Sequence, residues 1–128
     1  MKLLLDTHTF IWWDLEPGQL SPRGLSLCQN ASNQMVLSVA SVWEMQIKIQ
    51  LGKLQFPKPL RQMIAEQQEA NQMEILPVAL EHVLALAGLP MLHKDPFDRL
   101  IIAQAKTEAI TLLSRDPRMA AYPVAVDW

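Results

Sequence analysis

Short apolar runs alternate along this chain with longer segments of helical periodicity, and this alternation constrains the fold more than any other feature. The runs are apolar on both sides, which is typical of strands that helices cover on two faces. The intervening segments are long enough for crossovers between parallel strands. The sequence therefore predicts an α/β fold, with a short central parallel sheet flanked by helices (α/β/α). We expect strands at Lys2–Leu5, Gln34–Ser38, Glu74–Leu76, Ile110–Leu113 and Val124–Trp128.

Prolines and capping residues mark where the helices begin. Ser21-Pro22 and Asp95-Pro96 each place a capping side chain before a proline that suits the first helical position. In the second case Asp98 becomes the third helical residue, where it faces the positive end of the helix. Glycines and further prolines mark the ends. Helices are expected at 10–15, 22–31, 39–51, 60–70, 80–86 and 96–108.

Three expectations concern burial. His82 lies within a helical pattern and is expected at the surface. Of Trp12 and Trp13, we expect one to be buried and the other to pack on a partner. In the segment 39–51, apolar residues recur mostly at spacings of three and four, which predicts that the helix buries this face. The residues of this face are Val39, Val42, Trp43, Ile47 and Leu51.

Composition limits the class of protein. At 128 residues the chain is predicted to form one domain, spanning 1–128, because its length suffices for a single core. A content of 50% hydrophobic and 19% charged residues is typical of globular proteins. The net charge of −2 provides no general attraction for nucleic acid, so any such binding needs a local basic patch.

Signals for export and for membrane insertion are not found in the sequence. The first apolar run meets Asp6 too soon for a signal peptide, and no apolar run approaches membrane-spanning length. Cys28 is the only cysteine, which excludes an internal disulfide and a zinc site with several thiolates. We therefore expect a cytoplasmic protein without a membrane segment.

Four carboxylates occupy related positions in the predicted fold. Asp6 and Asp116 follow predicted strands, and Glu44 and Asp98 lie in the first turns of predicted helices. In an open parallel sheet, these positions face one crevice at the carboxyl edge. Four acids placed together repel one another unless a cation lies among them. Oxygen ligands without thiolates or paired histidines favour Mg²⁺ or Mn²⁺.

Each acid also has a structural interpretation, and the sequence leaves these alternatives open. Asp6 and Asp95 are suitable helix caps, and Asp98 is favourable near a helix N-terminus. The segment Ser41-Val42-Trp43-Glu44 has the spacing of a capping box, although Glu44 is also placed to pair with Lys48. Asp116 is a suitable turn residue before Pro117.

A family resemblance is carried by motifs that run almost end to end. The sequence resembles PIN domains, and most closely the VapC-type ribonuclease toxins of toxin–antitoxin pairs. Its Asp-Pro-Phe-Asp-Arg element is the most specific part of the match. The matching stretches are Leu4-Leu5-Asp6-Thr7-His8, Ser38-Val39-Ala40-Ser41-Val42-Trp43-Glu44, His93-Lys94-Asp95-Pro96-Phe97-Asp98-Arg99-Leu100-Ile101-Ile102-Ala103-Gln104-Ala105 and Leu113-Ser114-Arg115-Asp116.

The resemblance implies catalytic and metal-binding roles for the same acids. By motif match, the metal-binding catalytic carboxylates are Asp6, Glu44, Asp98 and Asp116. Thr7, Ser41 and Ser114 match the polar residues that support them, and Asp95 ranks as a supporting or capping residue. The implied activity is Mg²⁺- or Mn²⁺-dependent cleavage of RNA phosphodiester bonds. The implied partners are the RNA substrate, a second copy of the chain in a homodimer, and a cognate antitoxin.

Basic residues lie near the acids in the sequence, where a rim for RNA phosphates would have to be. The candidates for substrate binding are Lys94, Arg99, Arg115 and His8, and Arg118 belongs to the same cluster. The alternative is that these residues only balance the acids. His93 is a candidate for contact with substrate or for support of an acid.

Two other functions remain possible on the sequence alone. One is a non-catalytic PIN-like module that binds RNA or protein. The other is a phosphatase-like Mg²⁺ hydrolase on a related sheet, and the absence of an early Asp-x-Asp pattern counts against it, since Thr7 and His8 follow Asp6. A serine hydrolase is disfavoured because no histidine base accompanies the serines in a motif.

Overall fold

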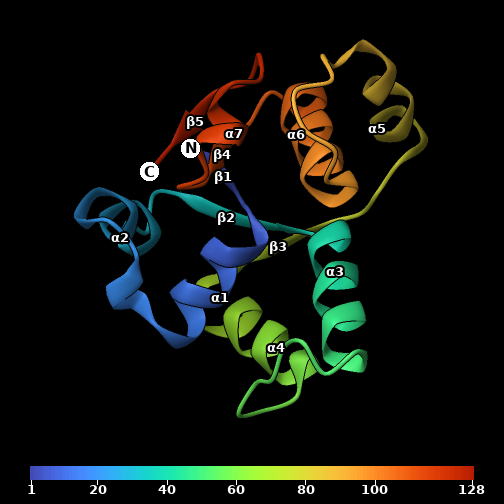
Figure 1. Cartoon of the computed structure of the whole chain (residues 1–128). Helices are drawn as coiled ribbons and strands as arrows, with labels where there is room; N and C mark the ends of the chain where they lie inside the picture. Colours follow the sequence, from blue (N-terminus) through green and yellow to red (C-terminus); the bar gives the residue numbers. More distant parts are fainter.

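A five-stranded sheet forms the centre of the computed structural model, which describes all residues from 1 to 128. The strands lie in the order β3-β2-β1-β4-β5, and every neighbouring pair is parallel (Figure 1). The predicted α/β/α architecture is therefore confirmed. The strands are β1 Lys2–Leu5, β2 Gln34–Ser38, β3 Glu74–Leu76, β4 Thr111–Leu113 and β5 Val126–Asp127.

The order of the strands places a switch point beside β1. The chain proceeds from β1 to β2 and β3 on one side, and then returns to add β4 on the other side of β1. Leu5 is in register with Leu37 of β2 and Leu113 of β4. The residues after these three strands therefore share one edge, the carboxyl edge where parallel sheets leave a crevice.

Helices cover both faces of the sheet because alternate strand residues point to opposite sides. Leu3 and Leu5 of β1 belong to a core with residues of α1 to α4, whereas Leu4 packs with residues of α6 and α7 on the other face. The helices are α1 Thr7–Leu15, α2 Pro22–Gln29, α3 Val39–Gln50, α4 Leu60–Asn71, α5 Leu80–Ala85, α6 Pro96–Glu108 and α7 Pro117–Ala120, with short 3₁₀ segments at Pro17–Gln19 and Leu86–Gly88.

The predicted buried face of α3 is wrong. Trp43 and Leu51 are 60% and 62% exposed, and Val39 is 41% exposed. The helix instead buries a mixed face, consisting of Ala40, Ser41, Glu44 and Met45. Because this buried face includes the polar residues Ser41 and Glu44, the spacing of apolar residues alone does not identify it.

The expectation that His82 lies at the surface is wrong, and so is the expectation that one of the two tryptophans is buried, whereas packing of the other on a partner stays a prediction. His82 is only 2% exposed. Its Nδ1 accepts a hydrogen bond from the Ala79 N–H at 2.9 Å, and its Nε2 lies 2.8 Å from a Glu108 carboxylate oxygen. Trp12 and Trp13 are both half-buried. No helix in the structure is long and apolar enough to span a membrane.

Candidate active site

A polar pocket of about 380 Å³ opens at the carboxyl edge of β1 and β4. It contains five carboxylates and three cationic side chains, with Trp12 as the only large apolar side chain in its wall. The four predicted acids are thus brought together at one pocket. Its lining residues are Asp6, Thr7, His8, Trp12, Glu44, Lys48, Asp95, Asp98, Arg115, Asp116, Pro117 and Arg118.

Asp6 lies directly after β1 and is 6% exposed. One carboxylate oxygen accepts the Thr9 N–H at 2.7 Å and so caps α1, which explains why this helix begins at Thr7, before the expected Phe10. The other oxygen accepts a hydrogen bond from the hydroxyl of Ser114, the residue directly after β4. Helix capping and support by Ser114 together fix Asp6 at the wall of the pocket.

Glu44 enters the pocket from the second turn of α3 and is 6% exposed. Its Oε1 accepts the Thr7 hydroxyl at 2.7 Å, and its Oε2 accepts Lys48 Nζ at 2.9 Å. The capping-box interpretation is wrong, because the helix is capped by Ser38, whose hydroxyl accepts the Ala40 N–H at 3.0 Å. The predicted pairing of Glu44 with Lys48 is confirmed.

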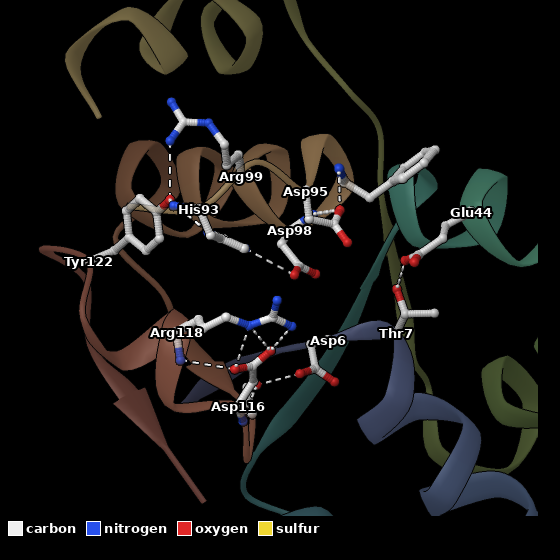
Figure 2. A network of polar contacts seen from close by, with 12 residues as sticks. Asp6, Thr7, Glu44, His93, Asp95, Asp98, Arg99, Asp116, Arg118 and Tyr122 are labelled. Atoms are coloured by element: carbon white, nitrogen blue, oxygen red, sulfur yellow. Dashed lines mark hydrogen bonds and ion pairs between the residues drawn. The ribbon is translucent and has the colours of Figure 1, made fainter. Parts of the chain in front are cut away.

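Asp95 and Asp98 have different roles at the start of α6. The Asp95 carboxylate accepts the N–H groups of Phe97 and Asp98 at 2.9 and 3.1 Å, which confirms its N-cap position. Asp98 Oδ2 instead lies 3.1 Å from His93 Nε2 (Figure 2). Burial raises the pKa of Asp98 to about 6, with the charges of Asp95 and Glu44 adding to the increase and the His93 hydrogen bond opposing it.

A hydrogen-bonded chain extends behind Asp98, away from the pocket. The Tyr122 hydroxyl lies 2.8 Å from His93 Nδ1 and accepts the His93 N–H at 3.2 Å. Arg99 Nη1 donates to the same hydroxyl at 3.1 Å and to the Pro90 carbonyl at 2.8 Å. Since carboxylates accept, His93 Nε2 carries the proton toward Asp98 and Nδ1 accepts from Tyr122.

Two of the predicted substrate-binding residues do not line the pocket. Arg99 is 9% exposed, and its guanidinium lies with Tyr122 on the side away from the acids (Figure 2). Successive helical residues point about 100° apart, so Arg99 cannot face the same way as Asp98. Lys94 is exposed but is not part of the lining.

Asp116 follows β4 and caps the short helix α7 by accepting the Arg118 N–H at 2.9 Å. The Arg118 side chain folds back onto the same carboxylate, with Nε at 3.2 Å from both oxygens and Nη2 at 2.8 Å from Oδ2. This guanidinium lowers the pKa of Asp116. The pKa of Arg118 is raised first by Asp116, with smaller contributions from Asp98 and Asp95.

Arg115 and His8 lie on the Trp12 side of the pocket. The Arg115 guanidinium lies 4.3 Å from the centre of the Trp12 ring, in a cation–π contact. The His8 and Trp12 rings are 5.6 Å apart at a tilt of 38°. Trp12 and Lys48 also line the pocket, although the sequence favoured a core or interface role for Trp12 and only an ion pair for Lys48. Each lies four residues after a predicted site residue and thus on the same helix face.

The donor set suits a hard divalent cation, because carboxylate oxygens from several separate elements surround one pocket. Ser41, also predicted to support the site, has a buried hydroxyl without a hydrogen-bond partner. No group of three or more His, Cys, Asp or Glu side chains is arranged as a ready-made metal-binding cluster. In this structure the carboxylates of Asp6, Glu44, Asp98 and Asp116 are each engaged by a donor within the chain.

Comparison with known proteins identifies the family. The model of the PIN domain matches residues 3–125. Ribonuclease VapC22 of Mycobacterium tuberculosis is 26% identical over 121 residues, covering 94% of this chain and 91% of the relative.

Solved structures share the fold at lower identity. A chain of VapBC2 from Rickettsia felis, solved bound to a DNA fragment from its promoter, has a TM-score of 0.72 and 18% identity, covering 99% of this chain and 98% of the other. A chain of DNA-bound VapBC from Salmonella typhimurium has a TM-score of 0.66 and 16% identity, covering 99% and 97%. With a family match along almost its whole length and the same fold, the chain belongs to the PIN domain family.

Proposed function

We propose that this protein is a Mg²⁺- or Mn²⁺-dependent endoribonuclease, and that it is the VapC-like toxin of a toxin–antitoxin pair. The observation that carries the proposal is the grouping of Asp6, Glu44, Asp98 and Asp116 around one pocket. The name of the relative, a ribonuclease, supports the same activity. A site with several carboxylates and no placed protein nucleophile fits a hydrolysis in which the acids would hold a divalent cation and the cation would activate water.

In the proposed mechanism, the four carboxylates hold one or two cations and supporting residues fix their orientation. Ser114 holds Asp6, and Thr7 holds Glu44. Asp95 caps α6, so that the helix begins at Pro96 and Asp98 lies in its first turn, beside the pocket. When bound, the cation makes a water nucleophilic near neutral pH and neutralises the charge that develops on the phosphate.

The RNA is proposed to enter along the side formed by His8, Trp12 and Arg115. Arg115 is exposed, and its stacking on Trp12 fixes a positive charge beside the acids. Because the chain has a net charge of −2, such a local contact is needed to attract phosphate. The two aromatic rings also provide a surface on which a base can stack.

The proposed partners are a second copy of the chain and an antitoxin. The two structural neighbours described above come from VapBC structures. This protein exposes large apolar side chains on α3, α5 and the segment after α5, which are available to pack against a partner. We further propose that the antitoxin offers a basic side chain to the acids.

Cleavage assays with purified protein test the activity. RNA should be cut in Mg²⁺ or Mn²⁺ and remain intact in chelator, and Asp6→Asn and Asp98→Asn should each lower the rate at least 100-fold, the order expected when a metal ligand is lost. Glu74→Gln is the matched control, because Glu74 pairs with Lys2 at the surface, away from the pocket. Full activity in chelator would refute the proposal.

A non-catalytic PIN module that binds RNA or protein is the second candidate, and the observation that favours it is that donors within the chain already engage all four acids. The two functions differ in their dependence on metal. If Mn²⁺ does not bind and RNA or partner binding survives Asp6→Asn and Asp98→Asn, the binding module is the better description. Loss of Mn²⁺ binding in the same variants supports the nuclease.

A further inference from the structure

Arg118 occupies the pocket in an arrangement that neither the fold nor the capping of α7 requires. Its backbone N–H already serves the cap on Asp116. Its side chain adds further bonds to both oxygens of that carboxylate, at 2.8 to 3.2 Å. Figure 2 shows the guanidinium between Asp116 and Asp98, and the charges of Asp98 and Asp95 also act on it.

The ion pair of Arg118 with Asp116 is well suited to exchange. The two side chains are 61% and 25% exposed, so the pair contributes little to stability and opens at low cost. By contrast, the guanidinium of Arg115 is held on Trp12 and contacts no pocket acid. Of the two pocket arginines, only Arg118 neutralises an acid that the proposed function assigns to the metal.

We propose that Asp116 binds Arg118 until a divalent cation displaces it, and that the freed Arg118 then binds a phosphate of the substrate. This inference rests on the proposed function. Both oxygens of Asp116 accept from the guanidinium, so Arg118 competes with a divalent cation for that carboxylate. The released guanidinium then lies at the rim of the pocket, where its planar donors suit a phosphate of the RNA. The exchange replaces one cationic partner of Asp116 with another.

Metal binding provides the first test and needs no RNA cleavage. Arg118→Gln removes the charge that competes for Asp116, so calorimetry should show Mn²⁺ binding about threefold to tenfold tighter than in the unchanged protein. Arg118→Lys keeps the charge but loses the planar fork, and its affinity should fall between the two. Arg23→Gln is the control, because Arg23 pairs with Asp127 outside the pocket and should leave Mn²⁺ affinity unchanged.

Steady-state cleavage provides the second test. Arg118→Gln should raise the KM for RNA about threefold to tenfold at saturating Mn²⁺, with a smaller change in kcat. A KM within twofold of the original rejects the phosphate role. Mn²⁺ affinity that is unchanged or weaker in Arg118→Gln overturns the exchange while leaving the proposed function intact. Failure of both proteins to bind Mn²⁺ overturns the proposed function and this inference together.

Discussion

His93 Nε2 lies 3.1 Å from Asp98 Oδ2, and this contact joins the acidic pocket to the C-terminal part of the chain. The opposite ring nitrogen of His93 meets the hydroxyl of Tyr122, which is 3% exposed. Tyr122 thereby fixes the ring that orients Asp98. A residue that does not line the pocket is thus linked to the direction of one of its carboxylates.

Tyr122→Phe should lower the free energy of unfolding by about 1–3 kcal/mol, because three hydrogen-bonding groups around the buried hydroxyl lose their partner. Mn²⁺ affinity should also fall, about threefold to tenfold, since Asp98 loses its orientation. Urea unfolding and calorimetry measure the two effects. A stability loss with unchanged Mn²⁺ affinity would show that Tyr122 acts on packing alone.

Asp98→Asn should stabilise the protein at neutral pH while it abolishes metal-dependent activity. Folding raises the pKa of Asp98 from 3.8 to about 6, so the folded state is less favourable for the charged carboxylate than the unfolded state is. The contribution of Asp98 to stability is therefore complete below pH 3.8 and is lost as pH rises through about 6. Because solvent screens the partly exposed Asp98, we expect Asp98→Asn to raise the free energy of unfolding at pH 7.5 by about 1 kcal/mol. This corresponds to an increase of roughly 3–5 °C in Tm.

Thermal unfolding between pH 4.5 and 8 tests this sign. The difference in Tm between Asp98→Asn and the unchanged protein should grow as pH rises toward about 6 and then level off. A difference that shrinks with rising pH would mean that the charged form of Asp98 is favoured by folding.

Thr7→Val should weaken metal binding as well as lower the stability of the fold. Valine has the shape of threonine but cannot donate to Glu44 Oε1, which leaves a buried oxygen without that partner. We expect a stability loss of about 1–2 kcal/mol and about tenfold weaker Mn²⁺ binding. Thr9→Val is the matched control, because Thr9 is also buried and its hydroxyl donates to the Leu113 carbonyl. Equal losses of Mn²⁺ affinity in both variants would argue against a specific role for Thr7.

Trp12→Leu should raise the KM for RNA about threefold to tenfold, because Arg115 loses the ring that positions it and a stacking surface disappears. Mn²⁺ affinity should not change, since Trp12 contacts no carboxylate through a hydrogen bond. Trp13→Leu is the control from the neighbouring position, which packs on the core and does not line the pocket. The same increase in KM for both variants would contradict a role in RNA binding.

The sheet was predictable because its strands are short, apolar on both sides and punctuated by polar residues. The grouping of Asp6 and Asp116 at the pocket followed from the same pattern, since the carboxyl ends of neighbouring parallel strands must meet. Capping by Asp95 followed from the proline after it. These features depend on local sequence and on strand direction, and both can be deduced from one chain.

Side-chain direction was harder to predict. Arg99 and Asp98 are adjacent in sequence, yet Arg99 binds Tyr122 and Asp98 faces the pocket. Their side chains differ in direction because consecutive residues of a helix point about 100° apart. His82 is buried by a long-range partner, Gln104, whose side chain lies 3.3 Å from its Nδ1. Such contacts depend on how α5 packs on α6, which no local pattern specifies.

The hydrogen bond between Ser114 and Asp6 joins residues 108 positions apart in the chain. Both strands at the switch point must therefore be made and paired before the wall of the pocket exists. A chain that has been synthesised only as far as α6 contains Asp6, Glu44 and Asp98, but it lacks β4 and the Ser114 hydroxyl that supports Asp6. Under the proposed function, the support of this first carboxylate is complete only when almost the whole chain has been made and folded.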